Sequence, residues 1–344
     1  MKNPPLNVSR KMKKTPVGEI PVEWSVVAIN KFAALKTGGT PSRACQGDYY
    51  NGTIPWVKTG DLNNGDIFRT EEKISSLALA ETSCSTIPAN SVLVAMYGGF
   101  KQIGRTGLLK MAAATNQALC AILHDESKVR SKFLQYWLNF RVGAWRKIAG
   151  SSRKDPNITK YDVGSLSVVV PSLVEQCKIE NTFYSWDCAI KQTEALVEAK
   201  RRFKAGLMQQ LLTGKRRFPT FGKKKGEGWT RYHLGDIFDE RNETGRGDLP
   251  LLSITADRGI VNRDDLEKKD TSNADKSKYL RIAPGDIGYN TMRMWQGVSA
   301  LSDLEGIVSP AYTVCIPKAG KIDGRFAAYL FKYQPVVHDF WRYS

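Results

Sequence analysis

The sequence is poor in the residues that build metal centres and disulfide frameworks. It contains three histidines among 344 residues, and its six cysteines are scattered without any C-x-x-C pair. These are Cys45, Cys84, Cys120, Cys177, Cys188 and Cys315. Zinc sites and disulfide-rich domains need closely spaced or paired ligands. We therefore expect no metal site, no bound cofactor and a reducing compartment, the cytoplasm.

Long apolar runs are also missing. No stretch approaches 18 apolar residues, and the basic N-terminal segment has neither an apolar core nor a small-residue cleavage site. Membrane spans and signal peptides are therefore not expected. The chain is nevertheless 42% hydrophobic, which is enough to bury real cores in two or three domains.

Acidic residues are under-represented. Lys and Arg total 51 against 34 Asp and Glu, giving a formal net charge of +17. Residues 199–226 include many Lys and Arg and no acid at all. A solvated surface usually mixes charges of both signs, so this bias favours a polyanionic partner, with nucleic acid as the first candidate.

The stretch 171–217 is expected to form one long helix. Ser172 and Glu175 have the spacing of a capping box, and Gly214 supplies a stop signal. Residues spaced alternately by four and three form a coiled-coil seam, with polar members at Thr193, Lys200 and Lys204. Its apolar members are Ile179, Phe183, Trp186, Ile190, Val197, Leu207 and Leu211. Such a helix is about 60 Å long and needs a partner helix to bury its seam.

The segments on either side of this helix resemble each other in order. Short strand-like runs at 54–57, 91–96 and 118–123 are followed by an aromatic-rich helix expected over 132–148, and a similar succession returns over 249–341. A helix is also expected over 27–35, and a last strand over 166–170. We infer a mixed α/β (α+β) fold with an N-terminal arm (1–19), a first domain (20–170), a spacer helix (171–217), a basic linker (218–227) and an incomplete second domain (228–344).

The loops of both repeats carry the residues of a DNA reader. Glycines let backbone amides approach phosphates, Lys and Arg neutralise phosphates, and Arg, Asn and Gln form paired hydrogen bonds to base edges. The first-repeat candidates are Lys36, Thr40, Ser42, Arg43, Lys58, Thr59, Tyr97, Lys101, Gln102, Arg105, Asn116 and Gln117. Those of the second are Arg241, Asn242, Arg246, Ser253, Thr255, Arg258, Tyr289, Asn290, Arg293 and Gln296.

Catalytic patterns are sparse. Asp66 with Glu71, Glu72 and Lys73 has the D…E-x-K order of a metal-dependent nuclease, in which acids hold the ion and a lysine assists the attacking water. Solvated polar residues of a hairpin give the same pattern. A free-standing nuclease stays open as the alternative function, and a scaffold whose charge only aids solubility stays open as a third.

Several motifs resemble those of a known family. Residues 20–24 (IPVEW), 36–43 (KTGGTPSR), 54–61 (IPWVKTGD) and 116–118 (NQA) are similar to the specificity subunits of type I restriction-modification enzymes. The segment 206–216 (GLMQQLLTGKR) is similar to the end of that family's central helix. The resemblance covers nearly the whole chain.

This resemblance implies two target-recognition domains that read the halves of a split DNA target, with the helix as a spacer. It implies that methyl transfer and cleavage belong to partner methyltransferase and restriction subunits, so that this subunit is not itself an enzyme. The family has a second spacer helix after the second domain, and here the sequence stops before it. We therefore expect a shortened subunit whose seam pairs with a second copy or with methyltransferase subunits.

Overall fold

The computed structural model describes residues 11–150, 156–221, 230–266 and 275–343, and these form two compact units, 1–192 and 193–344. The stretches 1–10 of the predicted arm and 222–227 of the predicted linker, together with residues 228–229 of the predicted second domain, lie outside the described residues. None of the described helices is long and apolar enough to cross a membrane.

The described part of unit 1 contains a five-stranded sheet, a four-stranded sheet and two two-stranded sheets, with short helices around them. Its elements, with 3-10 helices labelled η, are β1 (Met12–Thr15), β2 (Gly18–Pro21), β3 (Ser25–Ala28), η1 (Ile29–Lys31), β4 (Ala33–Thr37), η2 (Arg43–Cys45), α1 (Gln46–Tyr49), β5 (Ile54–Val57), η3 (Thr59–Asp61), β6 (Gly65–Ile67), β7 (Glu72–Ile74), α2 (Ser76–Glu81), β8 (Thr86–Ile87), β9 (Val92–Ala95), β10 (Thr106–Leu109), β11 (Ala113–Thr115), β12 (Leu119–His124), α3 (Ser131–Phe140), α4 (Val142–Gly150), α5 (Lys160–Ser165), β13 (Ser167–Val170) and the start of α6 (Leu173–Leu211).

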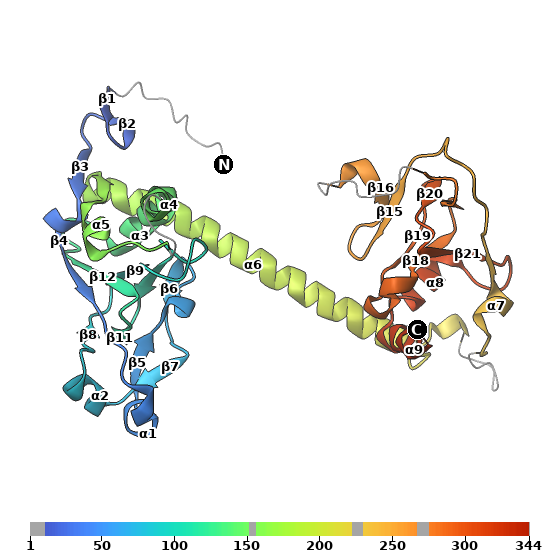
Figure 1. The fold of residues 1–344 in the computed structure, drawn as a ribbon, viewed down its shortest axis with the longest axis horizontal. Coiled ribbons are helices and arrows are strands. Elements are labelled where there is room, and N and C mark those ends of the chain that lie inside the picture. Colours follow the sequence, from blue (N-terminus) through green and yellow to red (C-terminus); the bar gives the residue numbers. More distant parts are fainter. Residues whose placement is uncertain (1–10, 151–155, 222–229, 267–274, 344) are drawn as a thin grey trace. The chain divides into compact units, whose positions relative to one another are not determined.

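The main sheet of unit 1 has the order β4-β12-β9-β10-β6, and a second sheet has the order β7-β5-β11-β8. Strand β9 is buried along its whole length because both faces of the main sheet are covered. Val92 and Val94 belong to the core under the helices, whereas Leu93 and Ala95 belong to the core on the opposite face. Figure 1 shows α3, α4 and α5 gathered beside the start of α6, with α1 and α2 at the far end of the unit.

Two sequence predictions in unit 1 are wrong. Residues 27–35 form no continuous helix: β3 pairs antiparallel with β13, η1 follows it, and β4 begins at Ala33. The β-branched Val26 and Val27 lie opposite Val169 and Val168, a long-range pairing that local pattern does not reveal. The expected helix over 132–148 is broken at Arg141, where the chain turns so that α4 buries Trp145 completely.

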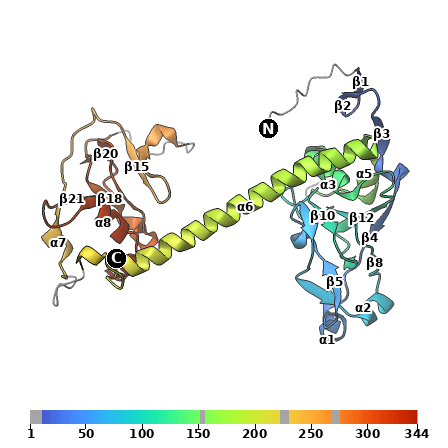
Figure 2. The same cartoon turned by 180° about the vertical axis from the view of Figure 1, so that it is seen from behind.

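Unit 2 is built from a smaller set of strands. After η4 (Pro219–Phe221), its elements are α7 (Leu234–Ile237), β14 (Phe238–Glu240), β15 (Leu252–Thr255), β16 (Gly259–Asn262), η5 (Arg263–Asp265), β17 (Leu280–Ile282), β18 (Ile287–Asn290), η6 (Thr291–Gln296), β19 (Ser299–Leu301), β20 (Gly306–Val308), β21 (Tyr312–Pro317), α8 (Gly324–Leu330) and α9 (Gln334–Tyr343). Helix α7 leads directly into β14, and Figure 2 shows α7 at one side of the unit.

The two units share a strand order. The order β14-β21-β18-β19 in unit 2 repeats β4-β12-β9-β10 in unit 1, with every neighbouring pair antiparallel. The parallel pairing of Trp56 with Ala114 has its counterpart in the parallel bridge between Leu251 and Ile307. The fold class is therefore confirmed as mixed α/β, with two similar units and a long helix.

Helix α6 is one continuous element of 39 residues. Gln176, which is fully buried, ties its first turns to unit 1: its amide accepts the Arg130 N–H at 2.9 Å and donates to the Pro171 carbonyl at 2.9 Å. The Arg130 guanidinium binds Glu180 through two hydrogen bonds, and the Tyr136 hydroxyl donates to Asp187 at 2.6 Å. These bonds fix the beginning of the helix on unit 1.

Candidate nucleic-acid interface

The short connection 116–118 between β11 and β12 is the meeting point of four loops in unit 1. The Gly39 N–H donates to Thr115 O at 3.0 Å, the Asn116 N–H to Val57 O at 3.0 Å, and the Met96 N–H to Ala118 O at 2.8 Å. The loops that begin after β4, β5 and β9 therefore all lie at one end of the sheets. We call this end the loop end of unit 1.

A glycine makes this convergence possible. A Cβ atom built on Gly38 would overlap the carbonyl oxygen of Thr115, so only glycine lets the loop after β4 pass so close to β11. The next carbonyl, that of Gly39, accepts a hydrogen bond from the buried Trp56 indole at 3.1 Å. The backbone of residues 38–39 is thereby fixed beside the connection 116–118.

Most of the first-repeat candidates lie at the loop end. The Thr40 hydroxyl donates to the side-chain oxygen of Gln117, which joins two of the loops. The buried side-chain oxygen of Asn116 has no hydrogen-bond partner within the described part of the chain. The Ser42 hydroxyl accepts the Ala44 N–H, and Lys36 lies near the end of β4. The other candidates in the loops at this end are Thr59 in η3, the exposed Tyr97 and Lys101, Gln102 and Arg105.

Arg43 and Lys58 are engaged within the protein. Arg43 binds Glu72 at 2.7 Å, with its guanidinium 4.0 Å from the centroid of the Tyr50 ring. Lys58 forms ion pairs with Glu71 and Glu72, and the hydrogen bond to Glu72 raises the pKa of Lys58 while that bond lowers the pKa of Glu72. These cations stabilise the loop end rather than project from it.

The same ion pairs disfavour the nuclease alternative. Asp66 is bound by Lys132 at 2.7 Å, and Glu71 and Glu72 are bound by Lys58, so each acid already has a cationic partner. Across the residues that the structure describes, no three His, Cys, Asp or Glu side chains are grouped so that they could hold a metal ion. Lys73 is exposed on β7, where it pairs through its backbone with Pro55.

Unit 2 has a loop end of the same construction. The Thr291 N–H donates to Ala311 O at 3.2 Å, which brings the loop after β18 beside the connection 309–311. The β15–β16 hairpin turns at the same end, where the Thr255 hydroxyl accepts the Arg258 N–H at 3.0 Å. The candidates Asn242, Arg258, Arg293 and Gln296 are exposed here, and Asn290 caps the Met292 N–H with its side chain.

Four second-repeat candidates are engaged by other side chains of unit 2 instead. The Arg241 guanidinium holds the buried Asp286 through two hydrogen bonds, and Arg246 pairs with Asp248 at 2.9 Å. Ser253 is 8% exposed and lies within hydrogen-bond reach of Arg263, and the Tyr289 ring packs against Phe331 and Phe340. Sequence alone does not indicate the partners of Arg241, Ser253 and Tyr289, because these partners stand ten or more residues away. The partner of Arg246 is local, since Asp248 follows it by two residues.

Three further side chains at the loop ends escaped the sequence prediction. Phe100, Met292 and Trp295 are 50%, 75% and 53% exposed. A large apolar side chain is usually buried in the core, so residue type alone predicts that these three are not at the surface. The sequence feature that could have predicted their exposure is their position in a loop, close to a glycine and a cationic residue.

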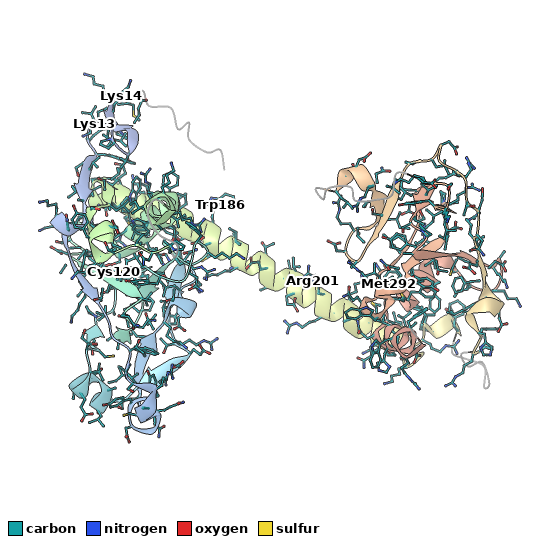
Figure 3. All side chains as sticks on the ribbon, in the orientation of Figure 1. Lys13, Lys14, Cys120, Trp186, Arg201 and Met292 are labelled. Carbon is teal, nitrogen blue, oxygen red and sulfur yellow. The ribbon has the colours of Figure 1, made fainter. Side chains whose placement is uncertain are left out.

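The seam of α6 is only partly covered. Ile179 packs on the core of unit 1 and Phe183 on the Tyr136 ring, but Trp186 and Ile190 are 67% and 54% exposed. Val197 is likewise exposed. Figure 3 shows Trp186 pointing out from the helix, with Arg201 projecting farther along it.

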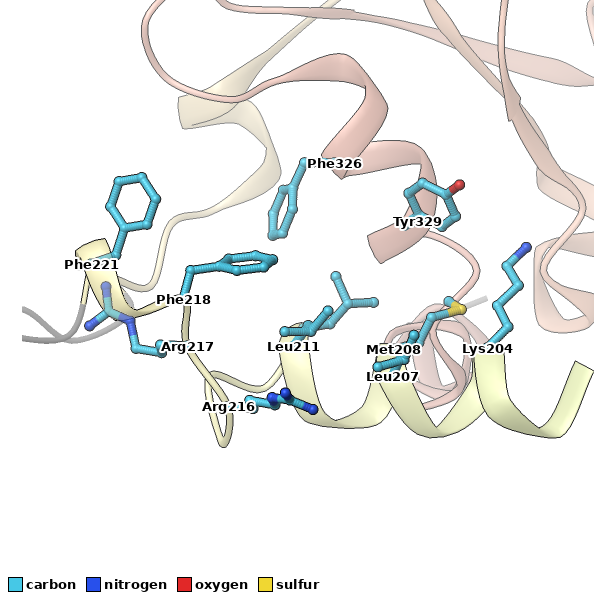
Figure 4. A pocket seen from close by; sticks show the side chains of 11 residues that line it. Lys204, Leu207, Met208, Leu211, Arg216, Arg217, Phe218, Phe221, Phe326 and Tyr329 are labelled. Carbon is cyan, nitrogen blue, oxygen red and sulfur yellow. The ribbon is translucent and has the colours of Figure 1, made fainter. Parts of the chain in front are cut away.

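The last turns of α6 line an apolar groove of about 730 Å³ within unit 2. Seam residues Leu207 and Leu211 form its floor together with Met208, and Phe218 and Phe326 close one side (Figure 4). The Lys204 ammonium stands 5.4 Å from the Tyr329 ring centroid at its rim. The groove is therefore an apolar surface with a cationic border.

Comparison with known proteins now gives the family. Residues 21–198, more than half of the chain, match the model of the type I restriction modification DNA specificity domain. The chain belongs to this family. The match includes most of unit 1 and the first part of α6, and therefore the loop end of unit 1.

Individual specificity subunits are similar over shorter stretches. The type I restriction enzyme MjaIX specificity subunit of Methanocaldococcus jannaschii is 25% identical over 237 residues, which is 65% of this chain and 54% of the relative. The EcoR124I/EcoR124II specificity subunit of Escherichia coli is 27% identical over 171 residues, 48% of this chain and 41% of the relative. The chain thus spans about half the length of these curated relatives.

Solved structures of the family share the fold. The S subunit of a type I restriction-modification system from M. genitalium covers 93% of this chain, and 80% of that subunit is covered in return, with a TM-score of 0.55 and 16% identity. A chain from a structure described for complex assembly and conformational transition of the type I R-M system has a TM-score of 0.53 at 17% identity, covering 91% and 80%.

Proposed function

We propose that this chain is the DNA-reading subunit of a type I restriction-modification complex and that it recognises a split target, one half with each unit. In this proposal residues 20–170 and 228–344 are the two target-recognition domains, and 171–217 is the spacer between them. The chain performs no chemistry itself. Methyl transfer and cleavage belong to partner methyltransferase and restriction subunits.

The repeated loop end is the observation that carries the proposal. Each unit has the same strand order and gathers its polar and cationic loop residues at the same end of its sheet. Lys101, Arg258 and Arg293 are exposed there and form no ion pair with another described residue, so they are available to phosphates. Asn116, Gln117 and Gln296 supply amide groups suited to base edges.

Selection from a pool of random duplexes tests this function. The isolated full-length chain is expected to enrich two short specified sequences separated by a fixed unspecified gap, and its binding should weaken steeply as salt rises. Plasmid incubated with the chain and magnesium should stay intact. A single contiguous motif, absence of binding at low salt, or magnesium-dependent cleavage would each contradict the proposal.

Partner helices are expected on the exposed seam of α6 and in the groove that continues it. The seam is apolar at Trp186, Ile190 and Val197, and a helix with such a stripe is normally buried against another helix. The partner is a second copy of this chain or a methyltransferase subunit, and both would work in the cytoplasm. Cationic groups at the groove, Lys204, Arg216 and Arg217, favour a partner with acidic residues beside its apolar face.

Light scattering after gel filtration distinguishes the two partners. A chain that pairs with itself gives twice the monomer mass alone, whereas a monomer that gains mass only with the methyltransferase identifies that subunit. Trp186→Glu combined with Ile190→Glu should abolish the association, and Lys191→Glu, exposed on the same helix outside the seam, should preserve it. Association that survives the double substitution would place the partner elsewhere.

A further inference from the structure

Equivalent loops in the two units present large apolar side chains at their loop ends. In the β9–β10 connection, Tyr97 and Phe100 are 43% and 50% exposed, and in the β18–β19 connection Met292 and Trp295 are 75% and 53% exposed. A single exposed apolar residue is ordinary in a soluble protein. Two of them at corresponding positions in both units indicate a shared use.

Strand register shows that the connections correspond. Val94 pairs with Thr106 across β9 and β10, and Tyr289 pairs with Ser299 across β18 and β19. Two residues before each of these partners stands a glycine in the left-handed region, Gly104 at φ 78° and Gly297 at φ 70°. A Cβ atom on Gly104 would press on Val142 of α4, and one on Gly297 would approach Val337 of α9.

The apolar side chains project from a fixed support. Ile103 is fully buried beneath the first loop and Met294 is 2% exposed beneath the second. The Gln102 N–H donates to Gly99 O at 2.9 Å, and the Gly297 N–H to Met294 O at 2.8 Å, so each loop is closed by its own backbone. A side chain held in this way enters a binding site with little further loss of conformational entropy.

A cation accompanies each apolar pair. Lys101 follows Phe100 directly, and Arg293 follows Met292; both are exposed and neither forms an ion pair with another described residue. An apolar side chain next to a cation suits a partner whose flat apolar faces are bordered by negative charge. Among the partners in the proposed function, the DNA duplex has this character, because its stacked base pairs lie between phosphates. Proteins that insert apolar side chains between base steps use this combination of wedge and cation.

We propose that each loop is a wedge that enters between neighbouring base pairs of its half-target, with Phe100 leading in unit 1 and Trp295 in unit 2. Lys101 and Arg293 neutralise the phosphates beside the opened step. This inference rests on the proposed function and deepens it, because recognition then depends on how easily a step unstacks as well as on hydrogen bonds to base edges. The DNA is unstacked at two places, one in each half.

Duplexes that carry 2-aminopurine at successive positions of the selected target test the wedge. This base changes its fluorescence when its stacking is lost, and the isolated chain is used so that no methyltransferase can displace a base. The wild-type chain should change the signal at one step in each half. Phe100→Ala should remove the change in one half only, and Trp295→Ala in the other, each with an affinity loss of about tenfold.

Matched controls separate the wedge from general apolar exposure. Phe68 follows the end of β6 and Leu304 follows β19, so both are exposed at the opposite end of their sheets from the loops. Phe68→Ala and Leu304→Ala should leave the fluorescence unchanged, and circular dichroism should show all four variants folded. Unaltered stacking in a duplex that the wild-type chain binds tightly would overturn the wedge and leave the proposed function intact. Absence of binding would overturn both.

Discussion

Arg241 and Asp286 form a two-point ion pair inside unit 2. The Arg241 Nε donates to Asp286 Oδ2 at 2.7 Å and its terminal nitrogen donates to Oδ1 at 3.1 Å, while the Asp286 carboxylate also accepts the Ala283 N–H at 2.8 Å. The hydrogen bond to Asp286, which is 2% exposed, raises the pKa of Arg241. Arg241 therefore holds a buried carboxylate in place.

Replacing Arg241 by alanine should destabilise unit 2 strongly. The substitution leaves the buried Asp286 carboxylate without its cation, and removing one partner of such a pair typically costs about 3–5 kcal/mol. The loss is measured as a decrease in the free energy of unfolding in urea.

The paired substitution Arg241→Leu with Asp286→Asn is the control. It removes both charges together and keeps a side-chain oxygen for the Ala283 N–H, so it should cost less than Arg241→Ala alone. A single variant as stable as the wild type would show that the carboxylate has another partner.

Gln176 should be the most sensitive position at the start of α6. Alanine there leaves the Arg130 N–H and the carbonyls of Lys128 and Pro171 without their buried partner. Loss of buried hydrogen-bond partners typically costs about 1–3 kcal/mol. Urea unfolding should report the loss, and faster hydrogen exchange at the Arg130 amide should locate it. Lys178→Ala, exposed on the same helix, should change neither measurement.

The sequence predicted correctly those elements that are determined by nearby residues, such as apolar runs, turn residues and a helix cap. The strands at 54–57 and 92–95 lie within apolar runs bounded by turn residues, and Ser172 begins α6 as its spacing with Glu175 indicated, since its hydroxyl accepts the Glu175 N–H at 3.3 Å. The helix expected over 27–35 failed because the partner of β3 is β13, which is distant in the sequence. The secondary structure of this segment is therefore determined by its long-range pairing with β13.

Candidate contact residues were harder to predict for a related reason. Arg43, Lys58 and Arg241 look like available cations in the sequence, but each one has an acidic partner that only the fold brings close. Conversely, Phe100 and Trp295 look like core residues and are exposed. The residue type shows which contacts a side chain can form. Whether the side chain is available to a partner depends on neighbours that are remote in the sequence.

Cysteine reactivity should follow burial. Cys120 lies on β12 in the core of unit 1, and burial raises the pKa of its thiol to about 12. At pH 8 its reactive thiolate is therefore about one part in ten thousand. A thiol reagent followed by mass spectrometry should label the half-buried Cys45, Cys177 and Cys188 first, and Cys120 only after urea is added. Rapid labelling of Cys120 in the native protein would show that the core of unit 1 opens readily.

Lys101 and Arg293 should contribute to DNA binding through charge alone. Each contact with a phosphate releases counterions, so the slope of the logarithm of affinity against the logarithm of salt should fall by about 0.9 for each cation replaced by alanine. The loss should be equal for target and unrelated duplexes. Gln117→Ala, which removes an amide from the loop end of unit 1, should instead reduce the preference for the target and leave the slope unchanged.

Lys128 supplies the control for this measurement. It is exposed in the turn after β12, at the end of the strand opposite the loops, and it is as exposed as Lys101. Lys128→Ala should therefore leave the salt slope at its wild-type value, although it removes the same charge as Lys101→Ala. If Lys128→Ala and Lys101→Ala reduced the salt slope equally, the slope would depend on net charge and not on the position of the lysine. The duplex would then not be held at the loop end.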